Sequence, residues 1–278
     1  MKFFRIAVCA FFVVSTVIFG FILFDRYTSD TTVPKIVCVT SEIELPVNAT
    51  DAEMLAGVTA TDAKDGDLTP KVMVEGISQF IEYGVANITY AVCDSDNHVS
   101  KITRRVRFTD YKSPRIYAVR DLTFVVNTAV NFDGMITASD VIDGNISNRI
   151  KLIASNVDVS KVGSYRITAS VSNSMGDVST MEFEVLVKEK PESNAQIELS
   201  TYTVYVKPGT KDFDPMSYVK NVTDINGTDA DLSAVTFKSG VNVSKEGVYT
   251  VTYYFTDLNG DTASVRLNVV VADESGVR

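Results

Sequence analysis

Five aspartates lie in two short turns and could supply oxygen ligands to a cation. Asp62, Asp65 and Asp67 fall within one turn, and Asp94 and Asp96 fall within a second turn later in the chain. Calcium takes roughly six to eight oxygen ligands, largely from carboxylates and carbonyls, so these five form a candidate calcium site if the turns meet. Asp and Gly are also ordinary turn formers, because Gly accepts positive φ and Asp bonds its own backbone. A calcium site and plain turn chemistry both stay open.

His98 is the single histidine of the chain and the first residue to test for acid or base catalysis. It stands in a predicted hairpin turn, and nothing around it in the sequence completes a triad with a nucleophile. The paired carboxylates of the acidic turns recur along the chain, which is typical of structure and not of one active site. We therefore expect no enzyme.

The cysteines offer one pairing outside the N-terminal segment. Cys9 lies in that segment, which leaves Cys38 and Cys93 as a pair that an oxidising exterior could bridge. Cys38 shares the phase of inward Ile36, whereas Cys93 is one position out of phase with inward Val92. Thiols on different faces do not meet readily. A disulfide stays open, and strand parity argues against it.

Three repeats place these residues. Each repeat has an acidic turn, then a glycine that opens an alternating strand, then a polar turn ten residues after that glycine. The glycines are Gly84, Gly163 and Gly247, so the period is 79 (163 minus 84) and then 84 (247 minus 163), the size of a small β-sandwich. The acidic turns begin at Asp62, Asp140 and Asp224, and the polar turns begin at Asp94, Asn173 and Asp257.

Alternation of apolar and polar residues predicts strands throughout the repeats. Apolar side chains occupy every second position after each glycine, which suits antiparallel sheets with one buried face. About seven short strands per repeat predict an Ig-like sandwich, in which the two turns of a repeat meet at one end. No segment after the first thirty residues predicts a helix. The inward positions are Ala86, Ile88, Tyr90 and Val92, then Tyr165, Ile167, Ala169 and Val171, then Tyr249, Val251, Tyr253 and Phe255.

Arg104 breaks this pattern, because repeats two and three place Phe183 and Leu267 at its position. A buried guanidinium without partners is costly, so we expect this segment to be exposed or Arg104 to reach water. The basic stretch 101–107 is either a patch for an anionic polymer or partner, or a charged edge strand that discourages aggregation.

The first thirty residues differ from the rest. Lys2 and Arg5 precede an uncharged run, Ile6–Phe24, whose nineteen residues would span roughly 28 Å as a helix, close to the thickness of a bilayer. The positive-inside tendency places the N-terminus in the cytoplasm and the chain after Tyr27 outside the cell. A cleaved secretory signal is the alternative, although its apolar run is usually shorter. The last residues carry no wall-sorting motif, so we expect tethering at the N-terminus.

The segments 58–68 and 245–253 resemble the bacterial Ig-like repeat found in a Cry22-type pesticidal crystal protein and in many Gram-positive surface proteins. The resemblance covers nearly all of 34–272. It implies an Ig-like (cadherin-like) fold in adhesive, spacer or wall-associated modules, without catalytic residues. The formal net charge of -9 argues against nucleic acid as a partner, because a phosphate backbone requires clustered basic residues.

The expectation is an all-β chain of three tandem Ig-like sandwiches after one transmembrane helix. Residues 1–33 would form the cytoplasmic stub, anchor and stalk, and the sandwiches would cover 34–112, 113–190 and 191–278. The expected role is a non-catalytic spacer or interaction arm at the cell membrane. The alternative is a receptor or adhesin for a surface protein or a glycan, with calcium stiffening the junctions between modules.

Overall fold

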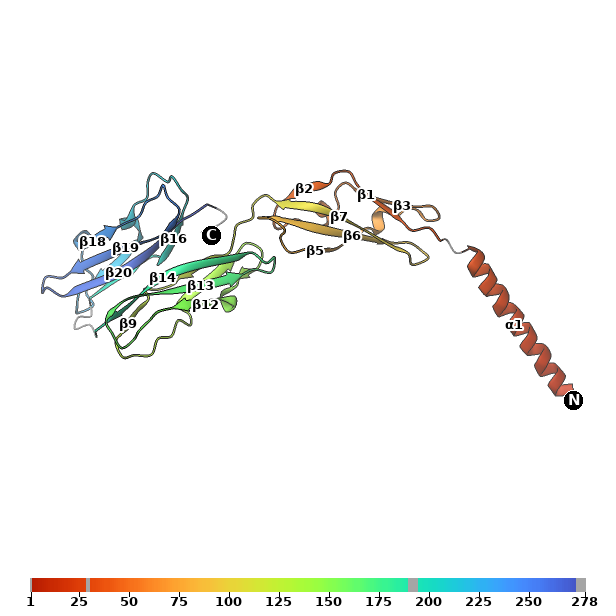
Figure 1. Ribbon diagram of the computed structural model, residues 1–278, viewed down its shortest axis with the longest axis horizontal. Helices are drawn as coiled ribbons and strands as arrows, with labels where there is room; N and C mark the ends of the chain where they lie inside the picture. The colour runs from red at the N-terminus through yellow and green to blue at the C-terminus, as the bar shows by residue number, and fades with distance from the viewer. Residues whose placement is uncertain (1, 29–30, 190–194, 274–278) are drawn as a thin grey trace. The chain divides into compact units, whose positions relative to one another are not determined.

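The computed structural model describes residues 2–28, 31–189 and 195–273. One long helix, α1 (Lys2–Thr28), stands at the N-terminal end, and strands make up most of the remaining described chain (Figure 1). The chain is therefore all-β with Ig-like sandwiches after an apolar helix, as the alternation predicts. The expected boundary between the second and third sandwiches, at residues 190 and 191, lies outside the described residues.

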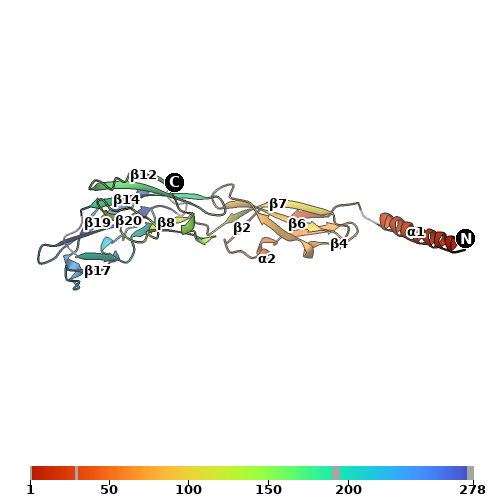
Figure 2. The ribbon, with the colours of Figure 1, turned by 90° about the horizontal axis from the view of Figure 1, so that it is seen from below.

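The first sandwich pairs a three-stranded sheet with a four-stranded sheet, and β6 and β7 run side by side in both views (Figure 1, Figure 2). The first sheet has the order β1 (Lys35–Cys38), β3 (Val58–Asp62), β4 (Gly66–Asp67). The second has the order β2 (Glu42–Leu45), β7 (Val99–Phe108), β6 (Val85–Cys93), β5 (Met73–Ile77).

The same strand order returns in the second sandwich, and in the third it returns without the short outer strand of the smaller sheet. In the second sandwich the sheets are β11 (Gly144–Asn145), β10 (Ile136–Asp140), β8 (Arg115–Ala118) and β12 (Lys151–Ser155), β13 (Gly163–Ser172), β14 (Val178–Lys188), β9 (Thr123–Val125). In the third they are β15 (Gln196–Leu199), β17 (Val219–Thr223) and β16 (Thr203–Val206), β20 (Thr262–Val271), β19 (Gly247–Thr256), β18 (Thr236–Ser239). The short strands β9 and β16 pair in parallel with β14 and β20, whereas the long strands pair antiparallel.

The buried residues follow the predicted stripes. The inward positions on β6, β13 and β19 are buried, except Tyr165 and Tyr249, which are only half-buried. Each of these two tyrosines lies over the glycine that opens its strand and donates its hydroxyl to the carbonyl four residues earlier, Lys161 or Lys245. Tyr165 and Tyr249 therefore cover the start of β13 and β19, and the next three inward residues of each strand form the core.

A short helix, α2 (Asp51–Met54), contradicts the prediction that no helix follows the first thirty residues. Thr50 accepts a hydrogen bond from the backbone of Glu53, and the Glu53 carboxylate accepts from the backbone of Thr50, which is a capping box. The signal Thr-x-x-Glu was present in the sequence, but one turn is too short to produce a helical period. Single turns of 3₁₀ helix also occur at η1 (Thr69–Lys71), η2 (Ser147–Arg149), η3 (Pro215–Tyr218) and η4 (Leu232–Ala234).

Arg104 is buried, which contradicts the expected exposure. β7 is a central strand between β2 and β6, and Arg104 is 5% exposed. Its guanidinium donates to the carbonyl of Ala56 at 2.7 Å and to the hydroxyl of Thr40. Neutral acceptors bind both terminal nitrogens of this guanidinium, whereas its Nε is buried without a hydrogen-bond partner. Arg104 therefore lies neither on an edge strand nor in a surface patch.

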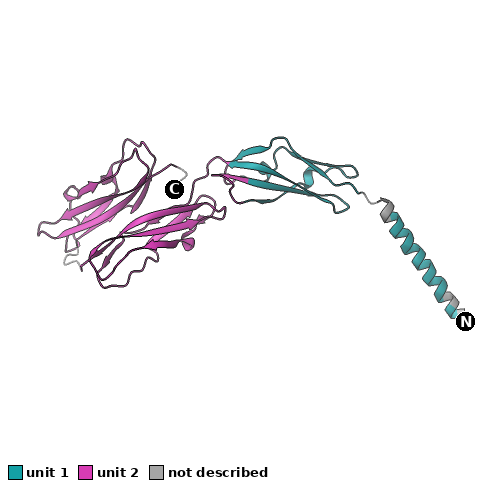
Figure 3. Ribbon diagram, viewed as in Figure 1, with its two compact units in different colours: residues 1–45, 49–78, 87–107 teal, residues 46–48, 79–86, 108–278 magenta. Residues whose placement is uncertain are grey.

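The chain divides into two compact units (Figure 3). Unit 1 comprises residues 1–45, 49–78 and 87–107, and unit 2 comprises 46–48, 79–86 and 108–278. The core of the second sandwich includes Val270 and Ala272 from the end of the third. Within unit 2 these two sandwiches therefore share packed apolar side chains.

Candidate functional site

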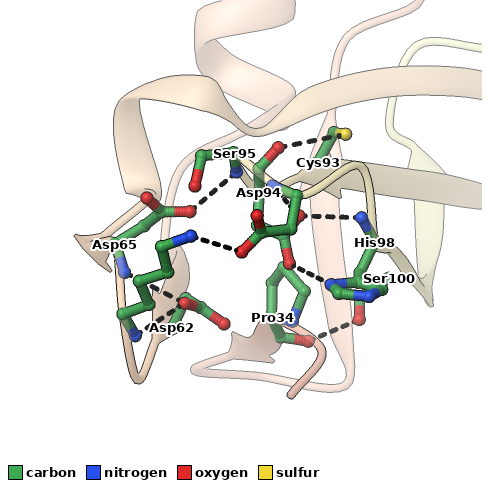
Figure 4. Close-up of polar contacts among 10 residues, drawn as sticks. Pro34, Asp62, Asp65, Cys93, Asp94, Ser95, His98 and Ser100 are labelled. Atoms are coloured by element: carbon green, nitrogen blue, oxygen red, sulfur yellow. Dashed lines mark hydrogen bonds and ion pairs between the residues drawn. The ribbon is translucent and has the colours of Figure 1, made fainter. Parts of the chain in front are cut away.

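The two acidic turns of the first sandwich meet, as the Ig-like geometry predicts. We call this cluster, Asp62, Lys64, Asp65, Asp94 and Asp96, the first pole (Figure 4). The backbone N–H of Ser95 donates to Oδ2 of Asp65 at 2.7 Å. The ammonium of Lys64 lies 2.7 Å from Oδ2 of Asp96. The Ser95–Asp65 hydrogen bond and the Lys64–Asp96 ion pair therefore join the turns.

The carboxylates of the first pole are used mainly by their own turns. Oδ1 of Asp62 accepts from the backbone of Lys64 at 2.9 Å and of Asp65 at 3.0 Å. Oδ1 of Asp94 accepts from the backbone of Asp96 at 2.9 Å and of His98 at 2.7 Å. This is the turn chemistry that Asp side chains supply in the absence of any ligand.

Asp67, the fifth calcium candidate, bonds in a different direction, to the backbone of Thr69 at 2.9 Å. Oδ2 of Asp62 is buried without a hydrogen-bond partner. Across the described ranges, no three His, Cys, Asp or Glu side chains lie so that they could hold a metal ion. Calcium at Asp62, Asp65, Asp67, Asp94 and Asp96 stays a prediction, and the hydrogen bonds favour the turn interpretation.

His98 has a partner that the sequence did not indicate. Its Nδ1 lies 2.8 Å from Oδ2 of Asp94, and the Asp94 side chain is nearly fully buried. The nearby hydroxyl of Ser100 donates to the carbonyl of Pro34 (Figure 4). His98 and Asp94 thus form a dyad that ties a turn together, whereas the serine beside it is engaged elsewhere.

Hydrogen bonding sets the acidity of two carboxyls at this end of the sandwich. Burial raises the pKa of Asp94, but hydrogen bonds from the backbone and ring of His98 outweigh it and hold that pKa below its ordinary value. Hydrogen bonds from the side chain and backbone of Thr69 lower the pKa of Asp67. Both carboxylates are therefore stabilised in the charged form by neighbouring donors.

Cys38 and Cys93 are free thiols, and Cys9 is free and exposed in α1. Cys38 is half-buried at the end of β1, and burial raises the pKa of its thiol. Cys93 is exposed at the end of β6, next to buried Val92. As the alternation predicts, Cys38 lies toward the inward side of its strand and Cys93 toward the outward side.

The other two sandwiches carry versions of the same pole. In the second, the backbone of Ser174 donates to Oδ2 of Asp143 at 2.6 Å, which repeats the bond between Ser95 and Asp65. In the third, a pocket of about 440 Å³ is lined by Asp224, Asp257 and eight further residues. Its walls include the apolar Phe255 and the fully exposed Leu258.

Residues 110–187 match a family model described as "Bacterial surface protein, Ig-like domain". The matched segment covers the strands of the second sandwich, β8 to β14, except the last residue of β14, Lys188. It confirms the resemblance to bacterial surface Ig-like repeats. The first and third sandwiches have the same order in their four-stranded sheets, and the two-stranded sheet of the third lacks only the short outer strand of the first, so the same fold continues on both sides of the match.

Two curated proteins are similar in sequence. The chain is 27% identical over 272 residues to the "Pesticidal crystal protein Cry22Aa" of Bacillus thuringiensis, an alignment that covers 93% of this chain and 35% of that protein. It is 26% identical over 144 residues to an "Uncharacterized 81.3 kDa protein" of Acholeplasma phage L2, covering 49% of this chain and 19% of the relative. The chain therefore spans about a third or less of each relative.

A solved structure of Drosophila N-cadherin, domains EC1-3, is also similar, with 13% identity, a TM-score of 0.34, and coverage of 84% of this chain and 98% of the cadherin chain. A TM-score of this size carries no argument about function. The fold assignment therefore depends on the strand order and on the family match.

Proposed function

We propose that this chain is a non-catalytic arm on the outer face of a bacterial cell, with three Ig-like sandwiches at 34–112, 113–190 and 191–278. The match of residues 110–187 to a family of bacterial surface Ig-like domains carries the proposal. The repeated strand order supports a modular arm, because each sandwich places its loops at its poles and its strands along its length. Such modules act as spacers or as interaction surfaces.

The tether in this proposal is α1. Its segment Ala7–Phe24 has eighteen residues, is long and apolar enough to cross a membrane, and is not buried by the rest of the described chain. A signal sequence near an N-terminus has the same features. We assign the segment to an uncleaved anchor in residues 1–33 because basic residues precede it and the apolar run is nineteen residues long.

The topology is tested with an epitope tag after Arg278 in a Gram-positive host. We expect the tag in the membrane fraction at full-length mass, and external protease should remove it from intact cells. A tag protected from protease would overturn the topology. A shortened chain released into the medium would replace the anchor with a cleaved signal.

A receptor or adhesin is the second candidate, and the pocket at the third pole favours it. A pocket with carboxylates and an exposed Leu258 suits contact with a protein or glycan better than a plain spacer surface does. A glycan array and a pull-down with the tagged chain test this function. A ligand that binds the unmodified chain but not Asp257→Asn or Leu258→Ser would support a receptor function. If the unmodified chain retains no ligand, the spacer function is supported.

A further inference from the structure

The corresponding pole of the second sandwich, which we call the second pole and define by Asp140, Asn173 and Asp177, is closed by an earlier part of the chain. Tyr111 donates its hydroxyl to Oδ2 of Asp177 at 2.6 Å. Ser113 donates its hydroxyl to the same oxygen, also at 2.6 Å. All five residues belong to unit 2.

Most of the network at the second pole is buried, with Asp177 partly exposed, and its members form hydrogen bonds with one another. Tyr111 is 3% exposed, and Ser113, Asn173 and Asp140 are also buried. The side-chain amide of Asn173 donates to the hydroxyl oxygen of Tyr111 at 2.9 Å and to Oδ2 of Asp140 at 3.2 Å. A buried polar network stabilises a fold when its groups are paired. This network therefore holds Tyr111 and Ser113 against the second sandwich.

Apolar packing and a backbone bond reinforce the contact. The ring of Phe80 meets the ring of Tyr111 edge-on with centroids 4.5 Å apart, and the backbone N–H of Phe80 donates to the carbonyl of Met175 at 2.9 Å. Gly84 has a φ of +66°, and a Cβ there would lie 3.5 Å from the Cβ of Tyr111. That distance is an ordinary contact, so the positive φ, and not the space beside Tyr111, is what favours glycine here.

The three poles differ at one decisive position. In each sandwich the first residue of the polar turn donates its backbone N–H to the carbonyl four residues later, so the three positions correspond. The second pole has an amide there, whereas the other two have carboxylates, which cannot donate a hydrogen bond when ionised. Only an amide can donate to both Asp140 and Tyr111. The bonds are Asp94 to His98, Asn173 to Asp177 and Asp257 to Asp261.

We propose that the second pole is an intramolecular docking site in which Tyr111, Ser113 and the segment 79–86 form a latch, closed by hydrogen bonds instead of by a cation. Burial and the neighbouring Asp177 raise the pKa of Tyr111, so its hydroxyl keeps the proton that it donates. The latch does not depend on the membrane tether or on an external partner. Because the polar groups of the second pole are bonded to one another, the second pole is not a candidate calcium site in this proposal.

Hydrogen exchange of the full chain in detergent micelles, read by mass spectrometry on peptides covering 79–86, tests the latch. Tyr111→Phe keeps the ring beside Phe80 and removes the hydroxyl, so exchange in 79–86 should rise about tenfold. Asn173→Asp is nearly isosteric and should accelerate it at least as much, because a third carboxylate replaces the donor. Tyr249→Phe is the matched control, since it removes a hydroxyl bonded to the carbonyl of Lys245 in the third sandwich.

Exchange of 79–86 in the unmodified chain should be equal in EDTA and in excess calcium. The proposal is overturned if Tyr111→Phe exchanges like the unmodified chain, or if EDTA alone opens the segment. Circular dichroism checks that each variant keeps its sheet content. If Tyr111→Phe loses it, Ser113→Ala takes its place with an expected increase of a few-fold, and no increase there counts against the latch.

Discussion

A cation buried among neutral acceptors is the least expected residue of the first sandwich. Arg104 donates to a carbonyl and a hydroxyl, and among the described residues no carboxylate forms an ion pair with it. Burying a charge without an opposite charge costs roughly several kcal/mol. Leaving a buried carbonyl without a donor costs about 1–3 kcal/mol. Replacing Arg104 by an uncharged residue removes the first cost and adds the second.

We therefore expect Arg104→Met to keep the free energy of unfolding of unit 1 within about 1 kcal/mol, because Met fills the space and the charge no longer has to be buried. Arg104→Ala should lose about 2–4 kcal/mol through the cavity it leaves. Urea denaturation of the full chain in micelles measures both. A Met variant as unstable as the Ala variant would show that the two hydrogen bonds dominate.

The dyad of Asp94 and His98 predicts a dependence of stability on pH. The pKa of Asp94 is lowered in the folded chain, so its contribution is present above the ordinary carboxyl value of about 4 and is lost as pH falls through the lower folded value. Between pH 5 and pH 3 the melting temperature of unit 1 should therefore fall more steeply in the unmodified chain than in Asp94→Asn. Equal slopes in a calorimetric series would contradict the role given to Asp94.

At the scale of elements, α2 depends on its capping box. The backbone and hydroxyl of Thr50 donate to the Glu53 carboxylate at 2.7 and 2.8 Å, and these bonds lower the pKa of Glu53. Thr50→Ala should destabilise unit 1 by about 1 kcal/mol. Thr50→Ser, which keeps the hydroxyl, is the control and should lose little. Thermal unfolding followed by circular dichroism distinguishes them, and equal losses in both variants would rule out a capping role.

The edge of β8 depends on side chains of β16. The hydroxyl of Tyr205 accepts from the backbone of Ile116 at 3.0 Å and donates to its carbonyl at 3.0 Å, and the hydroxyl of Thr203 accepts from Ala118 at 2.9 Å. Burial raises the pKa of Tyr205 to about 12. Tyr205→Phe strands both backbone groups of Ile116, so unit 2 should lose about 1–3 kcal/mol in urea denaturation. A loss no larger than that of Tyr249→Phe would contradict this role.

Strands and their inward faces were predictable because a half-buried sheet imposes a period of two over eight or more residues. The stripe ending at Val92 and the exposed Cys93 beside it follow from that period alone. The same period placed Arg104 on the inward face, where it is buried, but the cost of burying its charge led to the wrong expectation of exposure. The acceptors that make this burial tolerable, at Ala56 and Thr40, are far away in sequence and were not predictable. The turns of the first pole were predicted to meet, but the bond between His98 and Asp94 was not, because hydrogen bonds inside a turn leave no periodic signal.

At the scale of the whole molecule, the division into two compact units bears on which sandwiches unfold together. Arg266 of β20 lies 2.9 Å from Asp121, and Val270 and Ala272 pack into the core of the second sandwich. A shared core should make the second and third sandwiches unfold together, because neither can expose its part without exposing part of the other. The repeats alone predict three separate modules, and the contacts predict two cooperative blocks.

Differential scanning calorimetry of the full chain in micelles should therefore resolve two transitions. Thr50→Ala should move only the transition of unit 1, and Tyr205→Phe should move only that of unit 2. Arg266→Met, which removes the ion pairs of Arg266 with Asp121 and Glu184 of the second sandwich, should broaden or split the transition of unit 2 while leaving unit 1 in place. Three transitions in the unmodified chain would mean that each sandwich unfolds alone, and one transition would mean that the two units are coupled.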